Sequence, residues 1–339
     1  MKLKNLIVFI TNACNSKCIM CFNMDLNKDV KELTLQEYSQ IARNIDSLDE
    51  LLFSGGEPSL REDLPQICEL FYKNCNIKKI RIPMNGINTE KILVAVSDVL
   101  KLCPNAKIFV TLPLDGLGKD HDKQRGIANA FDRLIETYNK LEDLRSKYKR
   151  LNVGFVTTVT KINYSKIEEL IKYAENIKPR PSYHNLMVCR AQSKRVADDL
   201  LITPQMYEKI IKIENKYQNR WIENRYDWFF VPLVKSMYKI INNIYLHAYK
   251  NQQIIKCKAE EFIRIIEANG DVRICEMTAA IGNIKEHQYN LGMIKTPNSF
   301  RLGVKSCFCT HPCFVIPSIR YPSNLVRYTM FIIKKWFRA

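Results

Sequence analysis

Short apolar runs alternate with longer amphipathic segments throughout the first 190 residues. The apolar runs are short enough for strands and lie at 3–10, 50–54, 78–83, 106–112, 151–159 and 183–189. The segments between them have helical spacing and lie near 34–47, 61–74, 89–102, 126–148 and 164–176. Strands that alternate with helices of this length predict parallel βαβ units. In a barrel of such units, functional residues lie at the carboxyl ends of the strands.

The pattern changes after residue 190. Thr203 and Pro204 are typical of a helix start, with Thr203 as the cap and Pro204 in the first turn. Further on, strand-like segments flank Asn269-Gly270, a strong signal for a tight hairpin turn. The expected organisation is a core at 1–190, a helical connecting region at 191–256, a small α+β module at 257–315 and a tail at 316–339.

Three cysteines follow the first apolar run with the spacing Cys-x3-Cys-x2-Cys: Cys14, Cys18 and Cys21. Three thiolates on one short loop can hold a four-iron cluster and leave one iron without a protein ligand. Most clusters in electron carriers take four cysteines, so an open iron indicates a place for a substrate or cofactor. Zinc sites also use cysteines at such spacings, and the spacing alone favours neither metal.

A second motif follows the second apolar run, where Gly55-Gly56-Glu57-Pro58 comes directly after Ser54. A strand that runs into two glycines and a proline predicts a turn at the strand end. Paired glycines also let another molecule approach the backbone closely. By itself this motif is weak evidence for a functional site, because such sequences are usually only turns. Together with the cysteine loop at this distance it is strong evidence.

Together these motifs resemble those of the radical S-adenosylmethionine (radical SAM) superfamily. The cysteine loop, with Phe22 after its last cysteine, is similar to the cluster motif of that family. Two further segments resemble family motifs at the third and fourth strand ends: Met84-Asn85-Gly86, in which Met84 replaces a threonine, and Leu114-Asp115-Gly116, in which Pro113 replaces a serine.

The resemblance implies a partial (β/α)6 TIM-like barrel and a radical enzyme. Cys14, Cys18 and Cys21 would hold a site-differentiated [4Fe-4S] cluster whose open iron binds S-adenosylmethionine. One electron, from a reductant such as flavodoxin or ferredoxin, would cleave this cofactor to a 5′-deoxyadenosyl radical that abstracts hydrogen from a substrate. The cofactor contacts that the family pattern implies are Gly55, Gly56, Glu57, Pro58, Asn85, Asp115 and Thr158.

Five more cysteines lie near the carboxyl terminus: Cys257, Cys275, Cys307, Cys309 and Cys313. Their layout resembles the SPASM and twitch modules of the superfamily, although a complete SPASM module has seven cysteines. Four thiolates suffice for one fully ligated auxiliary [4Fe-4S] cluster. We expect Cys257, Cys275, Cys309 and Cys313 as its ligands, with Cys307 as a fifth candidate. A zinc site that includes His311 is the rival interpretation.

The substrate is the least defined part of the prediction. In the loop after the fourth strand, His121, Asp122 and Arg125 are candidate contacts for a polar substrate, and Arg190 could bind a carboxylate or phosphate. The Cys-x-Cys-x3-Cys ending, Cys307 to Cys313, resembles that of superfamily members associated with cell-surface sugar or lipid pathways. This resemblance implies hydrogen abstraction from a polar small molecule, glycan precursor or lipid-linked substrate, and a fully ligated second cluster would fit an oxidation. The alternatives are a non-catalytic iron–sulfur or zinc redox or RNA-binding protein, and a radical SAM maturase acting on peptide or RNA.

The charge is strongly positive and unevenly placed. The 339 residues include 52 Lys and Arg and 35 Asp and Glu, a formal net charge of +17, and no acidic residue follows Glu286. Such asymmetry indicates an anionic partner. Residues 324–339 have the pattern of a basic amphipathic helix, which can lie in an anionic membrane interface or dock on the protein's own core. A nucleic-acid partner is not expected.

The twelve cysteines and the amino terminus bear on the compartment. Leu6–Ile10 is too short for the apolar core of a signal peptide and leads straight into the cysteine loop. We therefore expect a cytoplasmic protein whose cysteines are reduced and cluster-binding, with possible contact to the inner face of the membrane through the tail.

Overall fold

The computed structural model describes residues 3–22, 30–189, 198–223, 229–298, 300 and 307–336. The chain divides into two compact units. The first comprises residues 1–200 and 260–296 and is called the sheet unit below. The second comprises residues 201–259 and 297–339 and is called the helical unit, because its long elements are all helices.

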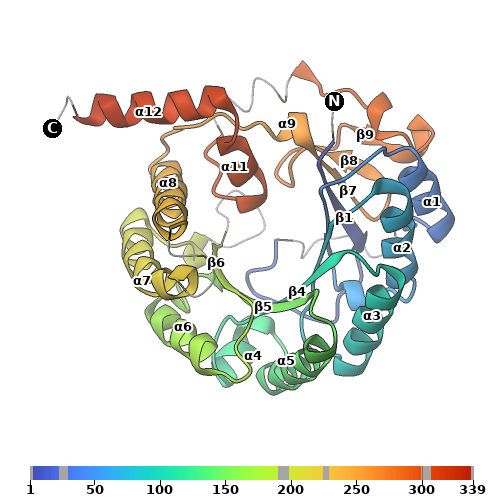
Figure 1. Ribbon diagram of the computed structural model, residues 1–339, viewed down its shortest axis with the longest axis horizontal. Coiled ribbons are helices and arrows are strands. Elements are labelled where there is room, and N and C mark those ends of the chain that lie inside the picture. The colour runs from blue at the N-terminus through green and yellow to red at the C-terminus, as the bar shows by residue number, and fades with distance from the viewer. Residues whose placement is uncertain are drawn as a thin grey trace. The chain divides into compact units, whose positions relative to one another are not determined.

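Six parallel strands in sequence order form most of the sheet unit (Figure 1). They are β1 (Asn5–Thr11), β2 (Glu50–Gly55), β3 (Lys79–Pro83), β4 (Lys107–Pro113), β5 (Leu151–Val159) and β6 (His184–Val188). All six lie where the apolar runs predict them. The expectation of an α/β fold with a parallel sheet is therefore confirmed, and the strand order is that of consecutive βα units.

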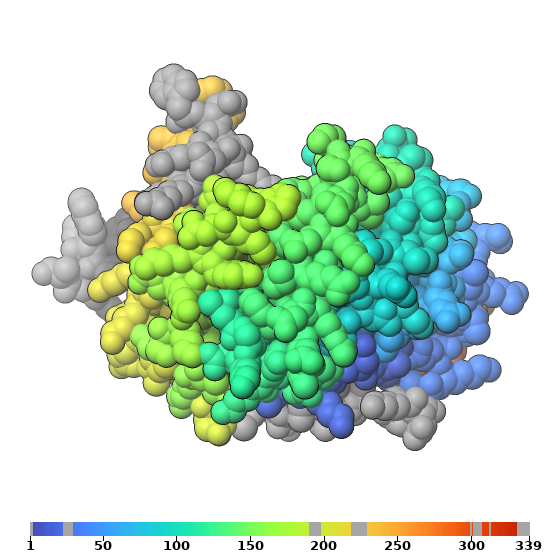
Figure 2. All heavy atoms as spheres, turned by 90° about the horizontal axis from the view of Figure 1, so that it is seen from below, coloured from blue at the N-terminus to red at the C-terminus, as the bar shows by residue number. Residues whose placement is uncertain are grey.

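Helices follow the strands and lie on the outer side of the curved sheet (Figure 1). They are α1 (Leu35–Arg43), α2 (Leu64–Cys75), α3 (Thr89–Leu102), α4 (Lys119–Arg125), α5 (Ala130–Lys147) and α6 (Ile167–Asn176). Seen from below, side chains of the helices close this outer face (Figure 2). Because both faces of β1 are covered, Leu6–Ile10 form an unbroken apolar run of buried side chains.

The predicted hairpin is confirmed, but it does not belong to a separate module. Strand β7 (Ile263–Ile266) pairs in parallel with β1, and β8 (Asp271–Arg273) and β9 (Gly282–Asn283) continue the same sheet in antiparallel fashion. Gly270, with a φ of 96°, makes the turn. Residues 260–296 belong to the sheet unit, whereas the predicted module runs from 257 to 315, and β7 covers the edge of β1 that would otherwise be open.

The helical unit consists of α7 (Pro204–Glu223), α8 (Val231–Tyr249), α11 (Pro312–Ile319) and α12 (Pro322–Trp336), with the short α9 (Ala259–Phe262) at its junction with the sheet unit. Its core contains Ile244, Ile254, Ile255 and Val315. The buried Asn324 amide donates to the carbonyls of Lys256 and Ser318, both at 2.8 Å, and fixes the start of α12. The predicted start of the tail at residue 316 lies inside α11.

Among the described residues, no helix is both long and apolar enough to cross a bilayer.

Candidate cluster and cofactor site

The cysteine loop and the glycine motif touch each other at the carboxyl ends of β1 and β2. The Gly56 amide donates to the Thr11 carbonyl at 2.7 Å, and the Glu57 amide donates to the Ala13 carbonyl at 2.8 Å. Two motifs about forty residues apart in the sequence are thus joined backbone to backbone. The loop that carries Cys14 starts from this junction.

Both glycines of the motif are required by this close approach. A Cβ atom on Gly56 would lie 2.0 Å from the Ala13 carbonyl oxygen. Gly55 has a φ of 106°, and a Cβ atom there would lie 2.5 Å from the Thr11 carbonyl oxygen. Any other residue at either position would displace the cysteine loop.

The loop has a second support that the sequence did not indicate. The amides of Lys17 and Ile19 donate to the carbonyls of Arg125 and Gln124, at 3.2 and 3.1 Å. A Cβ atom on Gly126 would lie 2.3 Å from the Lys17 carbonyl oxygen, so this glycine is also needed at the contact. The end of α4 therefore holds the middle of the cysteine loop. In the sequence, only Gly126, a glycine just past the end of α4, could have indicated a close backbone contact at this point.

The three cysteines of this loop are half-buried. Burial raises the pKa of the Cys18 thiol to about 11 and also raises that of Cys14, whereas the nearby Arg125 guanidinium lowers both. The Ser16 amide donates to the Cys14 sulfur at 3.4 Å. Among the described residues, no three His, Cys, Asp or Glu side chains lie within reach of one single metal ion. The donor set of three cysteines fits a four-iron cluster, in which each cysteine binds a different iron.

Glu57 and Asn85, expected as cofactor contacts, form a buried network that joins the motif to the loop. The Glu57 carboxylate is 2% exposed and accepts from the Ser59 hydroxyl at 2.6 Å and from the Asn85 amide at 2.7 Å. The Asn85 side chain donates to the Asn15 side-chain oxygen at 2.6 Å. Burial raises the pKa of Glu57, and the hydrogen bonds from Ser59 and Asn85 oppose that rise. The two residues fix the ends of β2 and β3 to the cysteine loop.

Asp115 lies beyond the end of β4 and is fully buried. Its carboxylate forms an ion pair with Arg125 at 3.2 Å and accepts from the Thr158 amide at 2.7 Å. Its carbonyl accepts from the Asn163 side chain at 3.0 Å and from the Gln124 side chain. Burial raises the pKa of Asp115, and the Arg125 charge opposes that rise. Asp115 and Thr158 thus bridge the ends of β4 and β5.

The candidate substrate residues of this loop are used by the loop itself. His121 is fully buried, burial lowers its pKa to about 3, and its Nδ1 accepts from the Asp115 amide at 3.3 Å. Asp122 accepts from the amides of Asn129 and Phe131, at 2.8 and 2.9 Å. Arg125 is paired with Asp115. His121, Asp122 and Arg125 therefore all make contacts that hold the loop after β4 in place. Arg190 lies outside the described residues.

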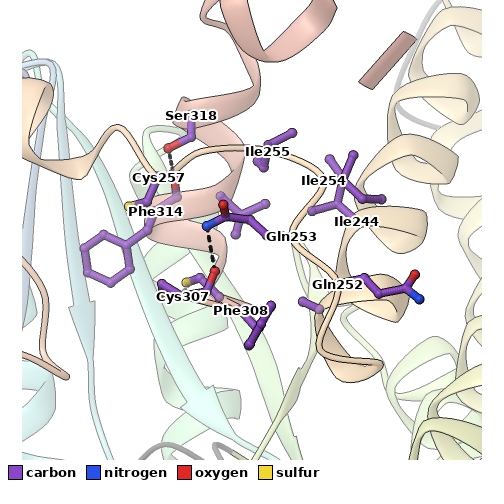
Figure 3. A pocket seen from close by; sticks show the side chains of 13 residues that line it. Ile244, Gln252, Gln253, Ile254, Ile255, Cys257, Cys307, Phe308, Phe314 and Ser318 are labelled. Carbon is purple, nitrogen blue, oxygen red and sulfur yellow. Dashed lines mark hydrogen bonds between the residues drawn. The ribbon is translucent and has the colours of Figure 1, made fainter. Parts of the chain in front are cut away.

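In the helical unit, three of the carboxyl-terminal cysteines line one pocket: Cys257, Cys307 and Cys309 (Figure 3). The Gln253 side chain donates to the Cys307 carbonyl at 3.0 Å, and Phe314 lies on the same side of the pocket as Cys257 and Cys307. All lining residues belong to the helical unit. Cys307, the doubtful fifth candidate in the sequence, thus shares a pocket with two of the expected ligands.

The remaining candidates are divided between the units. Cys313 begins α11, where its amide donates to His311 Nδ1 at 3.1 Å, and the His311 amide donates to the Cys309 sulfur at 3.3 Å. That ring nitrogen of His311 is therefore occupied as a helix cap, which weakens the zinc interpretation at this atom. Cys275 follows β8 and belongs to the sheet unit.

A buried hydroxyl near these cysteines was not indicated by the sequence. In the described structure the Tyr245 hydroxyl has no hydrogen-bond partner. Burial raises its pKa, and Cys309 and Cys313 are close enough to raise it further. A buried donor without an acceptor costs about 1–3 kcal/mol. Sulfur atoms of a cluster held by these cysteines would supply an acceptor, so the pocket fits such a group.

Comparisons with known proteins identify the first half of the chain. Residues 8–174 match the sequence model of the Radical SAM superfamily. The Fe-coproporphyrin III synthase of Methanosarcina barkeri is 28% identical over 197 residues, which cover 56% of this chain and 46% of that protein. The GTP 3′,8-cyclase of Synechocystis sp. is 25% identical over 234 residues, covering 67% of this chain and 66% of that protein. The chain spans about half the length of most curated relatives it matches.

A solved structure shares the fold. The structure of anSMEcpe with bound AdoMet superposes with a TM-score of 0.60 at 19% identity, and the match covers 91% of this chain and 81% of that one. The fold and the motif contacts define an α/β protein whose sequence motifs meet at the carboxyl ends of parallel strands. Specifically, the chain carries a radical SAM superfamily domain, and members of this superfamily are enzymes that catalyse radical reactions.

Proposed function

We propose that this protein is a radical SAM enzyme in which Cys14, Cys18 and Cys21 hold a [4Fe-4S] cluster. The observation that carries the proposal is the backbone junction between the cysteine loop and Gly56-Glu57. A cluster on this loop would sit beside the backbone of Gly55–Pro58, where the family pattern implies contact with the methionine end of S-adenosylmethionine. When bound, the reduced cluster supplies the electron that generates the 5′-deoxyadenosyl radical for hydrogen abstraction.

The residues around the loop hold this site in place. Gly55, Gly56, Glu57 and Pro58 would bind the methionine end, because their backbone meets the loop directly. Glu57 and Asn85 keep the loop in register through buried hydrogen bonds. Arg125 offsets the negative charge of the Cys18 and Cys14 thiolates, since its charge lowers both thiol pKa values. Asp115 orients Arg125, and its contact with Thr158 fixes the ends of β4 and β5, where the family pattern implies further contacts to the cofactor.

An auxiliary [4Fe-4S] cluster in a SPASM- or twitch-like module is the second part of the proposal. The shared pocket of Cys257, Cys307 and Cys309, with Cys313 four residues after Cys309 in the sequence, supports four ligands from the helical unit. Cys275 remains the alternative fourth ligand. A fully ligated second cluster favours electron transfer over substrate binding, which fits an oxidation of the substrate.

The proposed substrate is a polar small molecule, a glycan precursor or a lipid-linked molecule, and the proposed reductant is a flavodoxin or ferredoxin. The net charge of +17 supports anionic partners of this kind. Peripheral contact of the tail with an anionic membrane fits a lipid-linked substrate. A polar substrate would meet the radical at the carboxyl ends of the strands, where the motifs lie.

The test is anaerobic reconstitution followed by reaction with S-adenosylmethionine and a strong reductant. Wild-type protein should bind iron and form 5′-deoxyadenosine. The variant Cys14→Ala/Cys18→Ala/Cys21→Ala should form none. Cys68→Ala, the same change at a buried cysteine of α2, is the matched control and should retain the activity. Zinc in place of iron, or iron without cleavage of the cofactor, would support the non-catalytic alternative and overturn the proposal.

A further inference from the structure

The start of α8 exposes an unusual amount of apolar surface. Phe229 and Phe230 directly precede the helix, and Leu233, Met237 and Tyr238 lie in its first two turns. Their exposed fractions are 55% for Phe229, 47% for Phe230, 59% for Leu233, 47% for Met237 and 37% for Tyr238. Single exposed apolar residues are ordinary on a protein surface, but a contiguous group of this kind marks an interaction site.

This surface continues a face of α8 that is buried further along the helix. Leu233 and Met237 lie on the same helical face as Ile244 and Ala248, which are 3% and 7% exposed in the core of the helical unit. Tyr238 lies away from that face, and Lys235, Ser236 and Lys239 occupy the remaining side of the first turns, so this end of the helix is amphipathic.

The segment that starts at the exposed end carries only positive charge. Residues 229–259 contain five lysines, two of which are Lys235 and Lys239 in the first turns of α8, and no Asp or Glu. The helical unit as a whole has 17 Lys and Arg against 4 Asp and Glu. Aromatic and aliphatic side chains flanked by lysines are the combination that inserts at an anionic membrane interface.

A second element of the helical unit has the same character. In α12, Val326 and Met330 are 54% and 57% exposed and lie on one helical face. The opposite face is held to the unit, because Asn324 is buried and Tyr328 accepts from the Asn243 side chain at 3.2 Å. Arg327 adds positive charge beside the outward face.

We propose that the amino-terminal end of α8, residues 229–238, inserts into the interfacial region of an anionic lipid membrane. The phenylalanines, Leu233 and Met237 would enter the boundary between headgroups and acyl chains, and Lys235 and Lys239 would contact lipid phosphates. The positive charge of the helical unit disfavours a second copy of the chain, which would bring more lysines and arginines against Lys235 and Lys239. The aromatic residues could stack on nucleic-acid bases, but Leu233 and Met237 have no ring for stacking, so the mixed aromatic and aliphatic surface favours lipid over RNA as the source of negative charge.

The test is co-sedimentation of the full-length reconstituted protein with vesicles. One set contains phosphatidylcholine alone, and the other contains one third phosphatidylglycerol. The wild type should bind the anionic vesicles, and this binding should become weaker as the salt concentration rises. Leu233→Ser/Met237→Ser should bind about tenfold or more weakly, because two apolar side chains no longer leave water. Lys235→Gln/Lys239→Gln should reduce the preference for anionic vesicles.

Val94→Ser is the matched control, because Val94 is 63% exposed on α3 of the sheet unit, and it should bind as the wild type does. The side chains of Leu233, Met237, Lys239 and Val94 are exposed and that of Lys235 is half-buried, so the melting temperatures of the variants should stay close to that of the wild type. The proposal is overturned if the wild type does not bind anionic vesicles or if Leu233→Ser/Met237→Ser binds equally well. It is also overturned if that variant instead converts a dimer to a monomer in light scattering, which would assign the surface to a second copy.

Discussion

Gly56 shows how much the site depends on single residues. With alanine at this position, the new methyl group would lie 2.0 Å from the Ala13 carbonyl oxygen, a distance that forces the backbone to move. We therefore expect Gly56→Ala to displace the cysteine loop, to lose iron on reconstitution and to form about a hundredfold less 5′-deoxyadenosine, since small misplacements at a reacting centre cost this much.

Gly292→Ala provides the matched control for that experiment. A Cβ atom there meets only the Asn290 side chain, at 3.1 Å, so iron content and 5′-deoxyadenosine should remain at the wild-type level. Iron analysis and product chromatography give both readouts. Full iron binding and full cleavage in Gly56→Ala would show that the junction does not position the cluster.

Tyr245 offers a test of the second cluster at the same scale. If its buried hydroxyl donates to cluster or cysteine sulfur, Tyr245→Phe removes one hydrogen bond that stabilises the reduced, more negative state. The midpoint potential should then fall by about 20–60 mV, because a neutral hydrogen bond contributes about 0.5–1.5 kcal/mol and 59 mV is a factor of ten for one electron.

Tyr38→Phe is the control for Tyr245→Phe, because the Tyr38 hydroxyl is also buried without a partner in the described structure but lies in the sheet unit. Redox titration followed by electron paramagnetic resonance measures the potentials of both variants. An unchanged potential in Tyr245→Phe would exclude the hydrogen bond to the cluster.

The residues of the site were predictable to different degrees. The spacing of Cys14, Cys18 and Cys21 and the Gly55-Gly56 pair indicated the junction, because both motifs are local and both follow strands. The positioning roles of His121 and Gln124 were not predictable. In the sequence they belong to a polar loop, and only the return of that loop onto Lys17 and Asp115 buries them.

At the scale of the element, α5 contains a buried carboxylate with a perturbed pKa. Glu142 is 3% exposed, is paired with Arg145, and burial raises its pKa to about 7. The folded state therefore binds a proton more tightly than the unfolded chain does. Stability from this group is fully present below the unfolded pKa, near 4.5, and is lost as pH rises through about 7.

Glu142→Gln replaces the neutral acid by an uncharged amide of the same shape. The variant should therefore not lose stability as the pH rises through 7. Relative to the wild type, the variant should become more stable by about 1–2 kcal/mol between pH 5 and pH 8. Urea unfolding at both pH values measures the difference. Glu136→Gln, on the exposed face of the same helix, should show no such trend. A constant difference between wild type and Glu142→Gln across this range would contradict the raised pKa.

The elements themselves follow from the sequence where the signal is local. The apolar runs and amphipathic segments predicted the positions of β1–β6 and of the helices between them. This was possible because the spacing of hydrophobic residues within each βα unit is a local property of its sequence. The pairing of β7 with β1 could not be predicted, because it joins residues more than 250 positions apart in the sequence. The apolar sequence Ile263–Ile266 could pair equally well with any buried strand of the sheet. The hairpin was foreseen and its place in the sheet was not.

At the scale of the whole molecule, the two units contain different cysteine sets. Cys14, Cys18 and Cys21 belong to the sheet unit, whereas Cys257, Cys307, Cys309 and Cys313 belong to the helical unit. The units also differ in charge, because most of the excess of Lys and Arg is in the helical unit. Sites built on separate compact units can lose one group without losing the other.

The variant Cys257→Ala/Cys307→Ala/Cys309→Ala tests this separation. Wild-type protein should bind about eight irons and the variant about four. The variant should still cleave S-adenosylmethionine to 5′-deoxyadenosine, because the cysteine loop and its junction with Gly56 are intact. Turnover of substrate should be lost if the second cluster accepts an electron from the substrate. Iron analysis, Mössbauer spectroscopy and product chromatography distinguish these outcomes.

Cys275→Ala completes the experiment, because it decides which unit supplies the fourth ligand. If Cys313 is the fourth ligand, Cys275→Ala should keep about eight irons and Cys313→Ala should lose about four or gain a labile three-iron signal. If Cys275 is the fourth ligand, Cys275→Ala should lose about four irons and Cys313→Ala should keep about eight. Loss of all iron in Cys257→Ala/Cys307→Ala/Cys309→Ala would contradict the independence of the two sites, since the first cluster would then depend on the second.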